Sequence, residues 1–212
     1  MWEAIIHGFV LAFGLILPLG AQNVFVFSQG ASQPTLWRAM PVVVTAAFCD
    51  TVLILLAVLG VSLIVLSLAW LKMLLYAIGV LFLLYMGFLT WRSRPALDQP
   101  DTQSLFSPKK QVMFAASVSL FNPHAILDTV GVIGTSSLAY TGTAKWGFTL
   151  ACILVSMLWF LGLSIAGRLA GGLDKSGRLL RGFQIASACI MWGMAIYMAW
   201  NLFALWNLSS GA

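Results

Sequence analysis

The chain has 212 residues, of which 61% are hydrophobic and only 8% are charged. Soluble domains carry about 25% charged residues, so this balance excludes a soluble globular protein and predicts a polytopic membrane protein. The formal net charge of +5 would suggest a nucleic-acid partner in a soluble protein, but here the basic residues lie between apolar runs. We therefore expect no nucleic acid as a partner, and we expect the basic residues to set topology and to meet anionic lipid headgroups of the bilayer.

Six apolar runs follow one another along the chain, and each is long enough to cross a bilayer as a helix. Their approximate bounds are Ile5–Phe27, Pro41–Ser67, Leu71–Trp91, Val112–Thr135, Trp146–Leu169 and Phe183–Leu205. The segment before the first run contains Glu3, has no Lys or Arg, and lacks a small-residue cleavage motif. We expect the first run to be a retained helix and not a signal peptide.

Residues 92–111 form the longest polar stretch and separate the six runs into three and three. Three prolines, at positions 95, 100 and 108, are typical of a linker. The sequence thus predicts one all-α transmembrane domain over residues 1–212, with repeat one at 1–91, a cytoplasmic linker at 92–111 and repeat two at 112–212. Because each repeat has an odd number of helices, the two repeats are expected to insert with opposite orientation, as in many secondary transporters.

The Lys and Arg residues concentrate in alternate loops. One set contains Arg38, Arg92, Arg94, Lys109, Lys110, Arg168, Lys175, Arg178 and Arg181, and the other contains only Lys72 and Lys145. The positive-inside rule places the first set in the cytoplasm, which leaves both termini outside. If one run failed to span, the alternative would be a five-helix chain with its N-terminus inside.

A proline lies in the middle of the first and of the fourth apolar run. The spacing from Pro18 to Asn23 equals the spacing from Pro123 to Asp128, and Gly20 adds a second helix-weakening residue to the first run. A proline removes a backbone hydrogen bond and clashes with the preceding turn. The first and fourth helices are therefore expected to be interrupted, with freed backbone groups that face a cavity and not lipid.

Only two of the six acidic residues, Asp50 and Asp128, lie deep inside apolar runs. Asp50 is about a dozen residues beyond Arg38, which corresponds to about 18 Å along a helix and hence to the middle of the bilayer. No Lys or Arg is expected at that depth. Such carboxylates stay protonated, pair with each other, face water or bind a cation from solution. A protonated Asp that donates to a helix backbone is the structural alternative; a site that binds either a cationic solute or a proton is the functional one.

Neutral polar groups near the two interruptions complete the expected site. The amides of Gln22, Asn23 and Asn122 suit an ammonium group, and the N-termini of half-helices suit a carboxylate. Lysine or arginine would then find a partner for each of its groups. His124 is either a proton relay or a hydrogen-bonded structural residue.

The remaining polar and small residues in the apolar runs carry structural expectations. Four hydroxyl side chains are expected to satisfy carbonyls of their own helices, and they are Thr45, Thr51, Thr129 and Ser156. Gly167 and Gly171 form a small-xxx-small pattern that suggests helix packing. The three cysteines and two histidines form no cluster. We therefore expect no disulfide, no metal and no other cofactor.

Two stretches resemble the signature motifs of the LysE-type basic amino-acid exporters. Leu17–Val26, followed by Gln29 and Gly30, resembles the first motif, and Asn122–Thr129 resembles the second. Asp50 falls where that family carries an acid in its second helix. The resemblance extends over the whole chain. It implies a bacterial cytoplasmic (inner) membrane location, export of lysine or arginine, and coupling to the membrane electrochemical gradient. The positions it implies as functional are Pro18, Gly20, Gln22, Asn23, Asp50, Asn122, Pro123 and Asp128.

The first motif departs from the family pattern at one position. The family commonly has a second proline where this chain has Ala21, so a gentler break in the first helix is expected. The related exporters of homoserine, threonine and neutral amino acids typically have a Pro-Gly-Pro pattern without the Gln-Asn pair. The presence of Gln22 and Asn23 therefore favours a basic substrate.

The sequence as a whole predicts a secondary exporter of basic L-amino acids in exchange for protons, and not an enzyme. Asp50 and Asp128 are expected to bind the cationic groups and to titrate during the cycle. Exporters of neutral amino acids such as homoserine and threonine, or of another small metabolite, are the nearest alternative. An intramembrane aspartyl protease and a passive channel are the others, and a homo-oligomer is left open.

Overall fold

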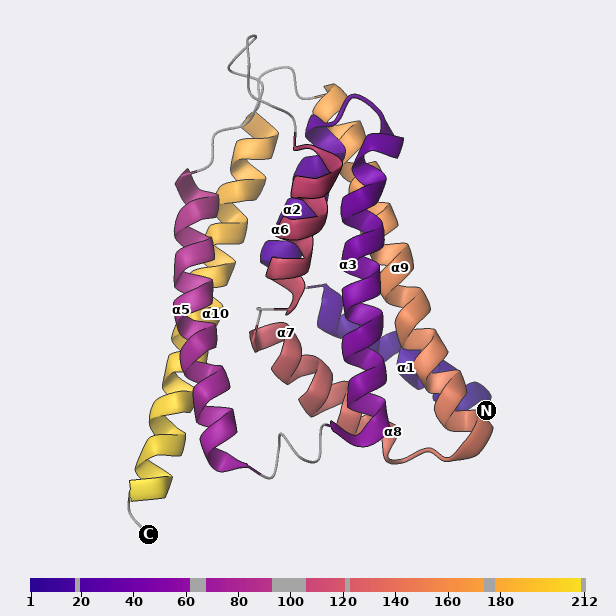
Figure 1. The fold of residues 1–212 in the computed structure, drawn as a ribbon, viewed down its shortest axis with the longest axis vertical. Helices are drawn as coiled ribbons and strands as arrows, with labels where there is room; N and C mark the ends of the chain where they lie inside the picture. Colours follow the sequence, from indigo (N-terminus) through magenta and orange to yellow (C-terminus); the bar gives the residue numbers. More distant parts are fainter. Residues whose placement is uncertain (18–19, 62–67, 93–105, 121–122, 174–177, 211–212) are drawn as a thin grey trace.

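The computed structural model describes residues 1–17, 20–61, 68–92, 106–120, 123–173 and 178–210. Within these residues every regular element is helical, as predicted (Figure 1). In chain order the elements are α1 (Trp2–Ile16), α2 (Ala21–Ser32), α3 (Leu36–Leu56), η1 (Ala57–Val61), α5 (Ala69–Arg92), α6 (Pro108–Leu120), α7 (Pro123–Asp128), η3 (Thr129–Gly134), α8 (Thr135–Ser137), α9 (Gly142–Leu173) and α10 (Arg178–Ser210).

The first apolar run is interrupted where the sequence predicts it. α1 ends at Ile16 and α2 begins at Ala21, and the two helices meet at an angle of 80°. Gly20 is the N-cap of α2 and has an extended backbone conformation. An angle of 80° is a sharp turn, even with Ala21 in place of a second proline. Pro18 itself lies outside the described residues.

The fourth apolar run is interrupted as well. α6 ends at Leu120 and α7 begins at Pro123, a position in the first turn where a proline is well tolerated because its missing N–H would have no partner there. Asn122 lies outside the described residues. α7 continues into the π-helical segment η3, and segments of this kind occur frequently at functional sites.

Length and composition identify two helices among the described residues that could cross a membrane alone. They are Leu36–Gly60, which covers α3 and most of η1, and Gly142–Gly172 in α9. The bent pair α1 and α2 would make a third span. Shorter apolar helical segments lie within α5 and α10. The six-span arrangement therefore stays a prediction.

The contacts between helices relate the two halves of the chain reciprocally. α1 and α2 from the first half pack on α9 of the second, and α6 and η3 from the second half pack on α3 of the first. α2 contacts α10, while α7 contacts α5. α3 packs against α9 and α5 against α10, so the remaining helices pair with their counterparts.

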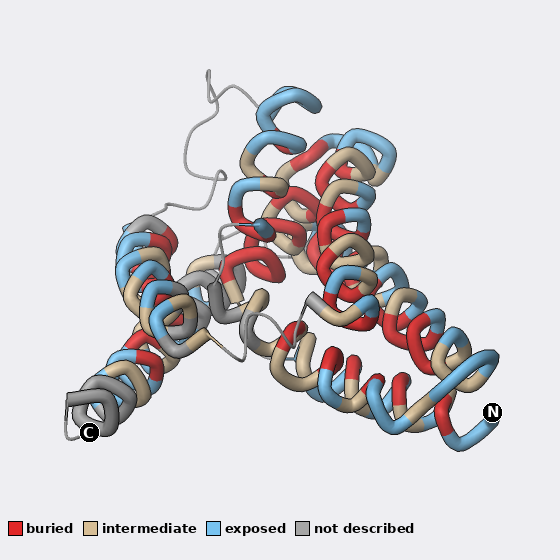
Figure 2. Tube along the Cα trace, turned by 60° about the horizontal axis from the view of Figure 1, so that its bottom comes forward, coloured by how far each residue is buried: buried red, intermediate tan, exposed pale blue. Residues whose placement is uncertain are grey.

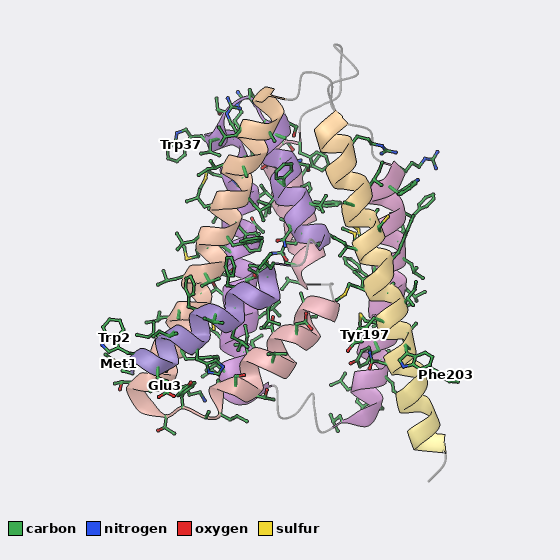
Figure 3. The ribbon with its side chains drawn as sticks, turned by 180° about the vertical axis from the view of Figure 1, so that it is seen from behind. Met1, Trp2, Glu3, Trp37, Tyr197 and Phe203 are labelled. Carbon is green, nitrogen blue, oxygen red and sulfur yellow. The ribbon has the colours of Figure 1, made fainter. Side chains whose placement is uncertain are left out.

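The basic side chains gather at one end of the bundle. The N- and C-termini lie at the lower end in Figure 1, whereas α3, α6 and α10 begin at the upper end, where α2, α5 and α9 finish. The basic residues in the terminal turns at the upper end are Arg38, Arg92, Lys109, Lys110, Arg168 and Arg181. Lys145, near the start of α9, lies at the lower end. In Figure 3 Trp37 lies near the upper end of the bundle, and Trp2 lies lower, at the start of α1.

Buried amide side chains tie the helices together at the upper end. Gln33, after α2, donates from Nε2 to the carbonyl oxygen of Phe106 at 3.1 Å. Gln111 in α6 donates to the carbonyl oxygen of Arg38 in α3 at 2.9 Å. Arg168 of α9 donates to the carbonyl oxygen of Gln33 at 2.8 Å. These contacts join α2, α3, α6 and α9 where the basic residues gather.

In Figure 2 the buried residues lie mainly on the sides of the helices that face one another. Many of the exposed residues are large and apolar. Phe148, Phe160 and Met191 are almost completely buried. In contrast, Trp200 and Phe203 of α10 are 72% and 61% exposed, which suits a surface in contact with lipid and not with water.

The small-xxx-small pattern predicted to pack helices does so between α9 and α2. A Cβ atom added at Gly167 would collide with the carbonyl oxygen of Phe27, and one at Gly171 would lie 2.7 Å from that of Ala31. Gly30 of α2 makes the reciprocal approach, because a Cβ there would collide with the backbone of Ser164. The two helices are therefore in direct backbone contact.

We expect Gly167→Ala to lower the midpoint of thermal unfolding of the detergent-purified protein, since α2 and α9 must separate to admit the methyl group. Gly162→Ala is the matched control on the same helix, because a Cβ there meets nothing within 4 Å. Alanine is favoured over glycine in a helix by about 1 kcal/mol, so the control should be neutral or stabilising. Equal midpoints for the two variants would contradict the backbone contact.

Candidate functional site

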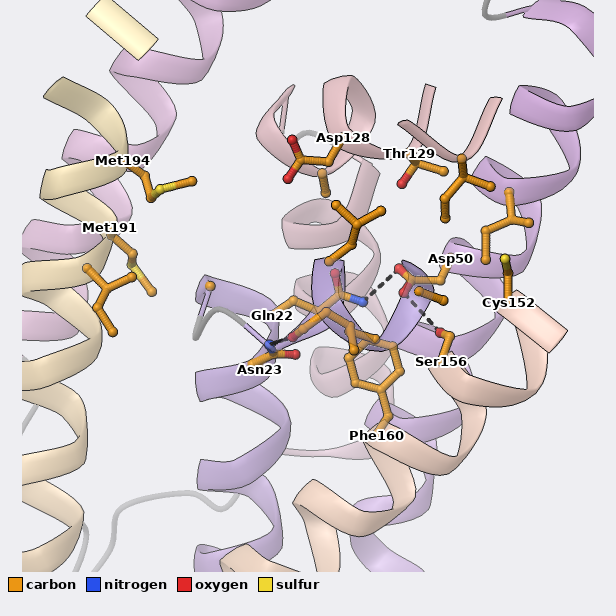
Figure 4. A pocket seen from close by; sticks show the side chains of 18 of the residues that line it. Gln22, Asn23, Asp50, Asp128, Thr129, Cys152, Ser156, Phe160, Met191 and Met194 are labelled. Carbon is orange, nitrogen blue, oxygen red and sulfur yellow. Dashed lines mark hydrogen bonds between the residues drawn. The ribbon is translucent and has the colours of Figure 1, made fainter. Parts of the chain in front are cut away.

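A cavity of about 120 Å³ lies between the two interruptions (Figure 4). A water molecule needs roughly 10–15 Å³ of such volume, so the cavity has room for several waters or for part of a small solute. Its wall is mostly apolar, with a small number of polar side chains, as is usual for small-molecule sites. The polar side chains are Gln22, Asn23, Asp50, Asp128, Thr129 and Ser156.

The carboxylate of Asp50 is the best-coordinated group in this cavity. Its Oδ1 accepts a hydrogen bond from Gln22 Nε2 at 3.2 Å, and its Oδ2 accepts one from Ser156 Oγ at 2.9 Å. Asp50 is on α3, Gln22 in the first turn of α2 and Ser156 on α9. Both donors are uncharged, so they orient the carboxylate without neutralising a charge on it. A cation bound in the cavity would neutralise the carboxylate.

Asn23 holds the first interruption together. Its Nδ2 donates to the carbonyl oxygen of Ile16 at 2.9 Å, and its Oδ1 accepts a hydrogen bond from Trp159 Nε1 at 3.2 Å. Ile16 is the last residue of α1, and the last carbonyl groups of a helix have no partner within it. Asn23 therefore links the end of α1 to α2 and α9, and so fixes the first turn of α2 beside Asp50.

Asp128 reaches the same cavity from the second interruption. It is the last residue of α7, and Figure 4 shows its carboxyl group on a different side of the cavity from Asp50. Thr129, the first residue of η3, lies next to it. The two acids from opposite halves of the chain thus share one cavity.

Five of the predicted site residues line the cavity, and they are Gly20, Gln22, Asn23, Asp50 and Asp128. Pro18 and Asn122 lie outside the described residues. Pro123 and His124 have described backbones in α7 but no described side chains, so the relay role of His124 stays a prediction.

The prediction for Ser156 was wrong, because its hydroxyl bonds to Asp50 and not to its own helix. Thr45 and Thr51 do bond to carbonyl groups one turn back, as predicted. The repeat spacing holds a signal that could have found Ser156. Asp50 lies 32 residues after Pro18, and Ser156 lies 33 residues after Pro123, so Ser156 is next to the position that corresponds to Asp50 in the other half.

A cavity that gathers several polar side chains between interrupted helices of an apolar bundle is typical of a membrane transporter. The family model described as LysE type translocator matches residues 13–202, and the chain belongs to this family. Nothing among solved structures matches the chain.

Relatives of known name cover nearly the whole chain. YisU of Bacillus subtilis (strain 168), named as a candidate amino-acid transporter, is 58% identical over 201 residues, which are 95% of this chain and 91% of YisU. The arginine exporter protein ArgO of Escherichia coli O157:H7 is 30% identical over 202 residues, 94% of each chain. ArgO of Serratia proteamaculans (strain 568) is 30% identical over 204 residues, 95% of this chain and 98% of that protein.

We expect Ser156→Ala to destabilise the protein, because it removes a hydrogen-bond donor from a carboxylate inside the bundle. Hydrogen bonds to charged groups contribute about 1.5–3 kcal/mol. Ser164→Ala is the matched control on the same helix, since the Ser164 hydroxyl is fully buried and makes no hydrogen bond. The measurement is the midpoint of thermal unfolding in detergent. A loss of stability in Ser164→Ala as large as in Ser156→Ala would show that the Asp50 contact is not the cause.

Proposed function

We propose that this protein is a secondary exporter of the basic amino acids lysine and arginine, driven by protons that move inward in exchange. The observation that carries the proposal is the pair Asp50 and Asp128 in one cavity of an apolar bundle. A buried carboxylate is stable when it is neutralised, either by a proton or by a cation. Similarity to relatives named as arginine exporters supports a cationic amino acid as the substrate.

The proposed site matches the groups of a basic amino acid. Asp50 and Asp128 each receive one of the two cationic groups, the α-ammonium and the side-chain cation. The first turn of α2, which opens on the cavity at Gly20, supplies backbone N–H groups and the positive end of a helix dipole for the substrate carboxylate. Gln22 and Asn23 hold that turn in place through their hydrogen bonds.

Exchange follows from competition at the two carboxylates. A basic amino acid that enters from the cytoplasm takes the place of protons on Asp50 and Asp128. After the cavity opens outward, protons from outside take the place of the substrate, and the protonated site returns. The hydrogen bonds that the side chains of Gln33, Gln111 and Arg168 donate to backbone carbonyl groups lie at the proposed cytoplasmic end, so we expect these contacts to open for the substrate to enter.

The proposed membrane topology has six spans in two inverted repeats, with both termini outside and the basic end of the bundle in the cytoplasm. The reciprocal contacts support this arrangement. α1 and α2 of the first half pack on α9 of the second half, and α6 and η3 of the second half pack on α3 of the first half. Most of the described basic residues belong to helix ends at one end of the bundle, whereas α1 begins and α10 ends at the other, and this supports the orientation. Family membership supports a bacterial cytoplasmic membrane location.

The orientation can be tested with reporter fusions in bacteria. We expect alkaline phosphatase fused to the C-terminus to be active, because that enzyme folds outside the cytoplasm, and a fluorescent protein fused there to be dark. The same reporters fused after Arg92 should give the opposite pattern. Active phosphatase after Arg92 would contradict the proposed topology.

We expect Asp50→Asn and Asp128→Asn each to lower the rate of lysine and arginine exchange in proteoliposomes by about 30-fold or more. Removing one member of a desolvated charge pair costs about 2–5 kcal/mol, which corresponds to a loss of this size. Substrate-dependent proton movement should fall together with the exchange rate. Glu3→Gln is the control, because Glu3 is an exposed carboxylate outside the cavity.

Normal substrate-dependent proton movement in both Asp variants would refute the assigned roles. A wild-type protein that exchanges homoserine or threonine faster than lysine or arginine would instead favour the neutral amino-acid alternative.

A further inference from the structure

The charged residues that line the cavity suit the ammonium groups of a basic amino acid but not its carboxylate. Among the described lining residues, two are carboxylates and none is Lys, Arg or His. The described basic residues Arg38 and Arg168 lie at the end of the bundle, where Arg168 donates to the carbonyl oxygen of Gln33. The lining thus contains two acidic groups that suit the cationic groups of a ligand, but no described lining residue offers a full positive charge to its carboxylate.

Three of the neutral polar side chains in the cavity donate to protein acceptors. Gln22 and Ser156 both donate to Asp50, and Asn23 donates to the carbonyl oxygen of Ile16. Among the described lining residues, the substrate carboxylate finds neutral donors only, such as the Thr129 hydroxyl and the backbone N–H groups in the first turn of α2, which carry only partial charge. In the same cavity it is repelled by two acids, because like charges at short range oppose each other most strongly where water is excluded.

The wall between the polar groups is suited to a chain of methylene groups. It contains aliphatic side chains from several helices together with two methionines, which are flexible and adapt to irregular apolar ligands. These residues include Leu15, Ile54, Leu83, Met191 and Met194. Figure 4 shows Met191 and Met194 on α10 across the cavity from Asp50.

We infer that the cavity recognises two cationic groups joined by an aliphatic chain, and that linear diamines such as 1,5-diaminopentane are therefore bound and transported alongside basic amino acids. This inference rests on the proposed function and extends its substrate class. A diamine carries two positive charges and no negative one, so it balances Asp50 and Asp128 completely. Lysine carries the same two cations together with a carboxylate that the cavity holds less well.

Four ligands separate the contributions of the carboxylate and of the side-chain ammonium to binding. L-lysine carries both the carboxylate and the side-chain ammonium, 1,5-diaminopentane lacks the carboxylate, L-norleucine lacks the side-chain ammonium, and 1-aminopentane lacks both. Their dissociation constants are measured by calorimetry on the purified full-length protein in nanodiscs. We expect loss of the side-chain ammonium to weaken binding by about 10-fold or more, the size of one charge-assisted hydrogen bond, and loss of the carboxylate to change it by less than about 3-fold.

The inference and the proposed function fail in different ways. If diaminopentane binds 10-fold more weakly than lysine, the carboxylate is recognised and the inference is wrong, while lysine export stands. If lysine itself binds no better than norleucine, the proposed function fails, and with it the inference.

A variant and a transport measurement complete the test. Asp128→Asn should weaken diaminopentane binding by about 10-fold or more, whereas Glu3→Gln should leave it unchanged. Diaminopentane loaded inside proteoliposomes should drive uptake of labelled lysine by exchange. Unchanged diamine affinity in Asp128→Asn, or binding without exchange, would overturn the inference.

Discussion

The structure depends on the carboxylate of Asp50, which accepts hydrogen bonds from both halves of the chain. Asp50 on α3 accepts hydrogen bonds from Gln22, at the start of α2, and from Ser156, on α9. A charged side chain inside a bilayer costs several kcal/mol, and it persists where it faces a polar cavity with partners. Gln22 reaches Asp50 because the first apolar run turns by 80° just before it. The interruption of that helix is thus a requirement of the site.

The two donors to Asp50 belong to helices that are held tightly together. Backbone contacts at Gly30 and Gly167 join α2 to α9, and the hydrogen bond from Trp159 to Asn23 joins them again beside the cavity. Asp50 lies on α3, which packs against both α9 and α6 from the other half. The bonds to Asp50 therefore join α3 to the pair formed by α2 and α9. A cation that binds Asp50 would compete with these bonds.

The sequence predicted the parts of this site that depend on rare residues, and missed the parts that depend on common ones. Two acids and two central prolines are conspicuous in apolar runs, so Asp50, Asp128 and both interruptions could be found. Ser156 could not be separated from Thr45 and Thr51 by residue type, because a hydroxyl in a helix bonds to its own backbone by default. Trp159, Met191 and Met194 gave no signal either. In a membrane helix the faces toward lipid and toward a cavity wall are both apolar, so hydrophobic periodicity does not distinguish them.

The acids occupy different places in the two halves, so the site is asymmetric. With Pro18 matched to Pro123, Asp128 corresponds to Asn23, and Asp50 corresponds to a position next to Ser156. Each half thus contributes one acid and one neutral hydrogen-bonding residue, in exchanged positions. In the structure the neutral members hold protein groups: Asn23 bonds to the end of α1 and Ser156 to Asp50. The two carboxylates consequently have different surroundings, even though the helices around them are reciprocally packed.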